Sequence, residues 1–178
     1  VDAVLLSHLH VDHCIDMCGL YVMMKYVPGG PGRESMPTWG PSGTGVHLAR
    51  AYGDSDGEDV LGLFDVHDLR DREPLAIGPF TVTPMRVNHP VEAYGFRVEC
   101  NGRVFVYTGD TDACDQLSEL MTGADLVLAD AAFVDGRDHA HGIHLSGRRA
   151  AEAAVRAGGV KRLMLTHLDD VLWPDAAI

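Results

Sequence analysis

Short apolar runs, each bounded by glycine, proline, asparagine or charged residues, recur through the middle of the chain. Runs of this length rich in valine, phenylalanine and tyrosine are typical of β-strands. The dipeptide Asn101-Gly102 separates two of them and favours the tight turn of a hairpin. The pattern therefore predicts strands over five segments: Phe64–Leu69, Leu75–Ile77, Phe80–Val87, Tyr94–Cys100 and Arg103–Tyr107.

Helices are predicted over three segments: Cys14–Tyr26, Asp112–Met121 and Leu145–Ala157. The last has Ser146 as its N-cap, an alanine-rich body and the pair Gly158-Gly159 as its stop. Three prolines make residues 28–37 a predicted loop. The glycine-rich residues 40–45 predict a strand-to-helix turn, because the lysine of a phosphate-binding loop is absent. Strands alternating with helices indicate an α/β sandwich.

Length and composition set the outer limits of this interpretation. A chain of 178 residues with 46% hydrophobic residues predicts one globular domain over residues 1–178. No stretch reaches the roughly 20 apolar residues of a membrane helix, and the N-terminus lacks the basic region of a signal peptide. The four cysteines form no Cys-x-x-Cys pair, so we expect free and mostly buried thiols. A cytoplasmic protein without a membrane partner is the expectation.

The formal net charge of −12 limits the possible partners. Nucleic-acid surfaces gather lysine and arginine against the phosphate backbone, whereas the 14 basic residues here are dispersed. No extended nucleic-acid surface is expected. A small anionic substrate is still compatible with an acidic protein, because bound divalent ions make a pocket locally less negative. Oligomeric state is open, and a homodimer is compatible with the sequence.

The first candidate metal ligands lie directly after the apolar run at residues 4–6. Three imidazoles and a carboxylate fall within six consecutive positions: His8, His10, Asp12 and His13. A strand ending in such a loop can direct His8 and His10 to one ion while Asp12 and His13 reach a second. Nitrogen with carboxylate oxygen suits zinc, manganese or iron better than calcium or magnesium. The alternative, a polar loop that is rich in histidine by coincidence, fits this spacing poorly.

Three further candidates each follow an apolar, strand-like segment: His89, Asp110 and His167. Together with the first motif they resemble the ligand set of the metallo-β-lactamase superfamily, whose signature is His-x-His-x-Asp-His. The resemblance implies an αββα sandwich with two metal ions at one edge. Members carry strands ahead of the first motif and continue beyond the last histidine. We therefore expect this sandwich to lack its N-terminal strands and its C-terminal end.

The resemblance also assigns roles. His8, His10 and His89 would hold one metal, Asp12, His13 and His167 the other, and Asp110 would bridge them. Two divalent ions, with zinc preferred over manganese or iron, would provide a bridging hydroxide for in-line attack. Asp12 would orient that nucleophile and take up its proton.

Residues other than the metal ligands narrow the resemblance to one branch of the superfamily. Asp130 in Ala129-Asp130-Ala131 and His144 before Leu145-Ser146 resemble the acid and histidine of RNase Z-like phosphodiesterases, in which the histidine gives a proton to the departing alkoxide. The acid of that branch is usually glutamate. Only twenty residues separate His89 from Asp110, which leaves no room for the basic arm of the tRNA-processing members.

Several stretches are similar to the actinobacterial-type, atypical class II cyclic-nucleotide phosphodiesterases: residues 6–10, 64–67, 89–92, 109–111, 114–117, 144–147 and 165–167. The resemblance implies hydrolysis of a small phosphodiester such as 3′,5′-cyclic AMP. A tRNA 3′-processing endonuclease, another hydrolase of this fold and a non-catalytic metal-binding relic are the alternatives. His47, His67, His139 and His141 are expected outside the ligand set, with His47 solvated on a helix.

Overall fold

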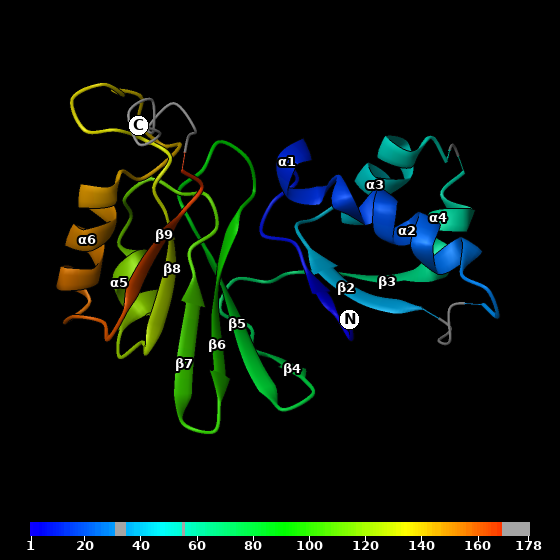
Figure 1. The fold of residues 1–178 in the computed structure, drawn as a ribbon, viewed down its shortest axis with the longest axis horizontal. Helices are drawn as coiled ribbons and strands as arrows, with labels where there is room; N and C mark the ends of the chain where they lie inside the picture. The colour runs from blue at the N-terminus through cyan, green and yellow to red at the C-terminus, as the bar shows by residue number, and fades with distance from the viewer. Residues whose placement is uncertain (31–34, 55, 169–178) are drawn as a thin grey trace, which may run out of the picture. The chain divides into compact units, whose positions relative to one another are not determined.

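The computed structural model describes residues 1–30, 35–54 and 56–168. The chain divides into two compact units, the first spanning Val1–Arg70 and the second beginning at Asp71. Each unit has its own β-sheet and its own apolar core (Figure 1). The assignment of residues 1–178 to one domain stays a prediction.

The sheet of the first unit is parallel throughout. Its strands are β1 (Val4–Leu5), β2 (Met36–Gly40) and β3 (Phe64–Asp68), in the order β1-β2-β3. Parallel neighbours need crossover connections, and helices provide them. The first crossover contains α1 (Val11–Cys14) and α2 (Asp16–Tyr26), and the second contains α3 (Thr44–Tyr52) and α4 (Glu58–Leu63). Helices α2, α3 and α4 lie on the same side of this sheet (Figure 1).

Large apolar side chains from the helices and the sheet fill the core of the first unit. Tyr21 and Phe64 are almost completely buried, and Leu6, Met17 and Leu48 pack with them. Cys14 belongs to the same cluster, as expected of a small apolar residue. All four cysteines of the chain are free thiols, as predicted, but only Cys14 is buried and the other three are half-buried, so the expectation of mostly buried thiols was wrong. This core holds the segment that follows β1, where the histidine-rich motif lies.

The second unit has a mixed sheet whose spatial order follows the sequence. Its strands are β4 (Leu75–Ile77), β5 (Phe80–Arg86), β6 (Tyr94–Cys100), β7 (Arg103–Tyr107), β8 (Leu126–Asp130) and β9 (Leu163–Thr166). Neighbours from β4 to β7 are antiparallel, whereas β7, β8 and β9 are parallel. Strands β5, β7, β8 and β9 therefore run in the same direction, and their carboxyl ends meet at one edge.

Two helices pack on one face of this mixed sheet (Figure 1). They are α5 (Gln116–Met121) and α6 (Gly147–Arg156), the crossovers of the parallel pairs. Leu117 and Leu120 of α5 are fully buried against Val106 and Val127 of the sheet. Helix α6 contributes alanines to this core, and their small side chains allow close approach of helix and sheet. Its N-cap is Ser146, whose hydroxyl accepts from Arg149 N at 3.3 Å, as predicted.

The strand predictions agree closely with the structure from β3 to β7, including the hairpin at Asn101-Gly102. Four segments differ. The helix expected from Asp112 begins only at Gln116, because residues 111–113 form hydrogen bonds to neighbouring loops. Pro37, assigned to a loop, lies in β2 before the residues that pair with β1, so its missing N–H costs no hydrogen bond to β1. Strand β8 and the short helix α4 were not predicted.

Candidate metal centre

The candidate functional side chains of the second unit lie at the edge of the mixed sheet where the carboxyl ends of its parallel strands meet. His89 follows β5, Asp110 follows β7, Asp130 is the last residue of β8, and His167 directly follows β9. Each follows a strand that runs in the same direction, which explains why residues far apart in the sequence meet here. The prediction that His89, Asp110 and His167 follow strands is confirmed, whereas the strand that Asp130 ends was not predicted.

Three of these residues form a compact cluster with His144, which combines oxygen and nitrogen donors. Asp110, Asp130, His144 and His167 each offer one ligand atom, and these atoms lie within 4.8 Å of one another. His167 Nε2 is 3.4 Å from Asp110 Oδ2, and its Nδ1 is 4.0 Å from Asp130 Oδ1. Both carboxylates are buried. Buried carboxylates beside imidazoles are a donor set that fits zinc, manganese or iron.

Asp130 is fixed by backbone donors as well as by histidine. Its Oδ2 accepts from Thr111 N at 3.0 Å, and its Oδ1 accepts from Ala132 N at 3.1 Å. The same Oδ2 lies 2.9 Å from His144 Nδ1. These donors fix the position of the carboxylate. Its contact with Nδ1 favours the tautomer of His144 that carries a proton on Nδ1 and a lone pair on Nε2.

His89 is oriented by the loop that carries His144. Its Nδ1 lies 2.9 Å from the carbonyl oxygen of Ile143, so in the neutral ring Nδ1 carries the proton and the lone pair is on Nε2. The rings of His89 and His144 have centroids 5.5 Å apart. A backbone carbonyl that fixes the tautomer of a histidine is a common accompaniment of metal ligation.

His167 has a backbone conformation that side chains rarely adopt. Its φ of 57° lies in the left-handed region, which is uncommon for residues other than glycine, although asparagine, aspartate and histidine adopt it more often than the rest. The turn directly after β9 places its ring in a stack on that of His144, with centroids 5.0 Å apart. Backbone strain of this kind is concentrated at functional sites.

The first unit presents the histidine-rich motif on the loop after β1 and on α1. His8 is completely buried, and its Nδ1 lies 3.1 Å from Ser7 Oγ. Its ring centroid is 4.8 Å from that of His10 and 4.2 Å from that of His13. Asp12, an exposed residue, lies with Oδ2 3.2 Å from His13 Nε2. The spacing of the motif thus gathers three imidazoles and a carboxylate, as expected.

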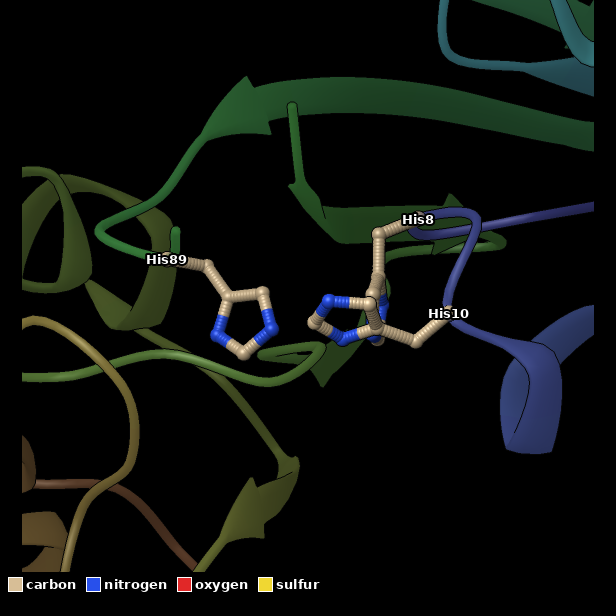
Figure 2. A group of neighbouring side chains, drawn as sticks. All are labelled: His8, His10 and His89. Atoms are coloured by element: carbon tan, nitrogen blue, oxygen red, sulfur yellow. The ribbon is translucent and has the colours of Figure 1, made fainter. Parts of the chain in front are cut away.

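Figure 2 shows His8 and His10 on the loop that leaves β1, and His89 on the loop that leaves β5. The predicted ligands are divided between the two units. His8, His10, Asp12 and His13 belong to the first, and His89, Asp110 and His167 to the second. Their union in one dinuclear centre, with the roles assigned above, stays a prediction.

A cavity of about 430 Å³ opens beside the cluster in the second unit. Seven residues line it: Ala132, Phe133, Arg137, Asp138, His144, His167 and Leu168. Its volume lies within the usual range of small-molecule sites. Phe133, Arg137 and Asp138 were not among the predicted site residues. The only available signal was their place in the loop between Asp130 and His144.

Arg137 and Asp138 form an ion pair at this cavity. Arg137 Nη2 lies 2.7 Å from Asp138 Oδ2, which also accepts from Val134 N at 2.8 Å. These hydrogen bonds, that from Arg137 above all, hold the pKa of the Asp138 carboxyl below its usual value. The Phe133 ring meets His144 edge-on, with centroids 5.1 Å apart. The cavity therefore combines an aromatic wall, a cation, an anion and two imidazoles.

The other histidines differ in their surroundings. His47, expected to be solvated, is half-buried on α3, and its Nε2 lies 3.5 Å from Cys14 Sγ. That expectation was wrong because His47 lies on the side of α3 that contacts Cys14 of α1, where it is partly shielded from solvent. His67 is exposed beside Asp65, and His139 and His141 are exposed, in agreement with a place outside the ligand set.

Acidic and histidine side chains gather at the strand ends of this α/β structure. They are the donors that metal-binding proteins use. The chain belongs to the beta-lactamase superfamily, whose domain matches residues 1–168. Its α/β metallo-β-lactamase fold is as predicted. Among the helices of the described residues, none has both the length and the apolar character needed to cross a membrane.

Similar proteins include an uncharacterized protein of Mycobacterium tuberculosis, 42% identical over 168 residues, which are 93% of this chain and 61% of that protein. A ribonuclease Z of Mycobacterium bovis is 30% identical over 196 residues, covering 98% of this chain and 69% of that enzyme. The metallo-beta-lactamase fold protein YhfI from Bacillus subtilis matches in structure with a TM-score of 0.76 and 27% identity, over 94% of this chain and 65% of YhfI. The chain thus spans about three fifths of the length of the mycobacterial relative.

Proposed function

We propose that this protein is a metal-dependent phosphodiesterase that hydrolyses a small phosphodiester, with a 3′,5′-cyclic nucleotide as its substrate class. The observation that carries the proposal is the contact between His144 Nδ1 and Asp130 Oδ2 at 2.9 Å, in a cluster with Asp110 and His167. Family membership and the similarity to a ribonuclease Z support the same chemistry.

The proposed ligands are the seven residues that the sequence singled out: His8, His10, Asp12, His13, His89, Asp110 and His167. Zinc is the preferred metal, because imidazole and carboxylate donors suit it. Two such ions, when bound, would activate a water molecule and neutralise charge on the phosphoryl oxygens.

In the proposed reaction a bond forms between the water oxygen and phosphorus while the bond from phosphorus to the ribose 3′ oxygen breaks. Asp12 accepts the proton of the attacking water. His144 in its protonated form donates a proton to the departing 3′ oxygen, which would otherwise leave as an unstable alkoxide. Asp130 supports this role because its Oδ2, 2.9 Å from His144 Nδ1, fixes the orientation of the imidazole.

Three observations favour a small substrate over a large RNA. Residues 90–109 contain a short loop and the hairpin of β6 and β7, with no inserted arm. The cavity of about 430 Å³ has the volume of a small-molecule site. The chain also has a net charge of −12, which opposes a long polyanion. Phe133 would provide an apolar wall for the nucleoside, and Arg137 a cation for the phosphate.

The test is hydrolysis of cyclic AMP by the zinc- or manganese-loaded, full-length protein. Bis(p-nitrophenyl) phosphate serves as a second substrate, and Asp110→Ala as the inactive control. Turnover of cyclic AMP that is lost in the control supports the proposal. Failure to cleave either ester, despite stoichiometric metal binding, would overturn it and favour a metal-binding protein without catalysis.

The alternative function is that of a ribonuclease Z-like tRNA 3′-processing endonuclease. The similarity to the ribonuclease Z of Mycobacterium bovis supports it. Its test is cleavage of a tRNA precursor at the 3′ trailer under the same conditions. Cleavage of that precursor without hydrolysis of cyclic AMP would replace the first proposal with the second.

A further inference from the structure

The loop that carries His144 is held by hydrogen bonds at three consecutive residues. Gly142 N donates to Asp112 Oδ2 at 2.7 Å, and the carbonyl of Ile143 accepts from His89 Nδ1 at 2.9 Å. The carbonyl of His144 accepts from Arg149 Nη1 at 3.2 Å. Asp112 lies in the loop after β7, His89 in the loop after β5 and Arg149 in the first turn of α6, so three separate segments fix this loop.

Asp112 and Arg149 also form an ion pair with each other, between Arg149 Nη2 and Asp112 Oδ1. The Asp112 side chain is only 5% exposed, and that of Arg149 is 27% exposed. Removing one partner of such a buried pair leaves an uncompensated charge, so the pair acts as a unit. Asp112 is itself anchored, since its N–H donates to the Asn88 carbonyl at 2.8 Å and Ala113 N donates to its Oδ1.

The position of Arg149 on α6 is not explained by helix formation. The amino-terminal turn of a helix carries a partial positive charge and favours acidic residues, yet α6 has no acidic residue there. A cation at this position is unfavourable unless another interaction offsets it. The ion pair with Asp112 and the hydrogen bond to the His144 carbonyl provide that interaction.

We infer that Asp112 and Arg149 are positioning residues that fix the orientation of His144 for proton transfer. Neither residue reaches the cavity lining, so both act through the loop backbone. One nitrogen of the guanidinium binds the Asp112 carboxylate while the other binds the His144 carbonyl, a geometry that lysine cannot reproduce. This inference rests on the proposed phosphodiesterase function, because it assigns His144 the role of proton donor.

The leaving group supplies a selective test. The ribose 3′ oxygen of cyclic AMP needs a proton as it departs, whereas p-nitrophenolate leaves well without one. Arg149→Met in the metal-loaded, full-length protein should lower kcat for cyclic AMP by about 10- to 100-fold, the order expected for a displaced catalytic group. KM for cyclic AMP and turnover of bis(p-nitrophenyl) phosphate should change by less than about threefold. Arg149→Lys should restore part of the lost kcat.

The neighbouring Arg148 provides the matched control, because its side chain is 70% exposed and contacts only Asp135, at 3.7 Å, among its ion pairs in the described residues. Arg148→Met should leave both substrates unaffected. A second readout needs no metal: amide hydrogen exchange at residues 142–145 should increase in Arg149→Met and not in Arg148→Met. If Arg149→Met fails to fold, the same kinetic and hydrogen-exchange measurements on Arg149→Lys and Asp112→Asn test the inference.

Equal loss of activity on both substrates, a rise in KM with kcat unchanged, or wild-type exchange at residues 142–145 would overturn the inference. Failure of the proposed function would look different, because the wild-type protein would then not hydrolyse cyclic AMP at all. In that event the hydrogen-exchange comparison still tests whether Arg149 fixes the loop.

Discussion

His144 Nδ1 and Asp130 Oδ2 lie 2.9 Å apart, although fourteen positions separate the two residues in the sequence. Asp130 ends β8, and His144 precedes the N-cap of α6. The loop between them carries Phe133, Arg137 and Asp138, which line the cavity. This contact thus closes the loop that carries the proposed proton donor and the residues proposed to contact the substrate.

This pair leads to the first prediction. His144→Ala should lower kcat for cyclic AMP by about 10²- to 10⁴-fold, the usual contribution of a general acid. It should have little effect on bis(p-nitrophenyl) phosphate, whose leaving group needs no proton. Asp130→Asn should give the same selectivity with a smaller loss, because the amide keeps an acceptor and removes the negative charge.

Steady-state kinetics on both esters, with metal content measured for each variant, check this prediction. Exposed His139 is the matched control, and His139→Ala should behave as wild type. Loss of bound metal in His144→Ala would contradict the assignment of this residue to proton transfer and favour ligation.

Arg137 and Asp138 give opposite predictions at the cavity. Arg137→Ala should raise KM for cyclic AMP by about tenfold, because loss of one charge-assisted hydrogen bond costs about 1.5 kcal/mol. Asp138→Asn should lower KM, since it removes the carboxylate that competes with the phosphate for the guanidinium. Initial rates over a range of substrate concentrations measure both. A KM that is unchanged in Arg137→Ala would exclude this residue from substrate binding.

Asp125 lies outside the candidate site, and its contacts predict that the stability of the fold depends on pH. Its carboxylate accepts from Lys161 Nζ at 2.6 Å, Val104 N at 2.8 Å and Arg103 Nη1 at 3.0 Å. These contacts, led by Lys161, hold the pKa of Asp125 well below its ordinary value of 3.8. A carboxyl whose pKa is lower in the folded state stabilises that state above its ordinary pKa. The contribution is lost as the pH falls below 3.8 toward the folded-state pKa.

The Tm difference between wild type and Asp125→Asn should therefore be largest near neutral pH and shrink below pH 3.8. Thermal unfolding from pH 7 to pH 2.5 measures it. Glu152→Gln, an exposed change on α6, is the control and should show no comparable difference. A Tm difference for Asp125→Asn that is constant over this range would argue against a charged role.

Gly95 in β6 is predicted to be required for packing. A Cβ at this position would lie 2.7 Å from Leu120 Cδ2, 3.0 Å from the Thr108 carbonyl oxygen and 3.1 Å from that of Tyr107. The leucine can shift, but the two carbonyls belong to the sheet. Gly95→Ala should lower the free energy of unfolding by about 1–3 kcal/mol, as overpacking does.

The control is Gly19→Ala in α2, where a Cβ meets nothing within 4 Å. That change should raise stability by about 0.5–1 kcal/mol, because alanine is the better helix former. Urea unfolding of both variants gives the two values. A Gly95→Ala protein as stable as wild type would show that the sheet adjusts easily at this position.

Sequence reasoning worked where local pattern and structure agree. The hairpin of β6 and β7 was predicted from Asn101-Gly102, and α6 from Ser146 and its alanines. Strand β8 was missed because a short, continuously apolar run is equally compatible with a buried helix. The start of α5 was wrong because long-range contacts decide it: Asp112 N donates to the Asn88 carbonyl, which pairs the loop with a distant segment.

The site shows the same division. Histidine and aspartate at strand ends could be predicted as candidates from their types and spacing. Phe133, Arg137 and Asp138 could not, because phenylalanine and an Arg-Asp pair in a loop carry no distinctive spacing. These three residues became candidates only because the folded chain places them around one cavity with His144 and His167.

Thr108 at the carboxyl end of β7 is completely buried, donates to the Gly109 carbonyl at 2.7 Å and accepts from Asp130 N at 2.9 Å. Exchange of this hydroxyl for a methyl group would remove both hydrogen bonds at once and leave the buried N–H of Asp130 without this acceptor. The cavity loop between Ala132 and His141 is largely half-buried or exposed. Substitutions in that loop can therefore change the lining of the cavity with little effect on the buried strand ends.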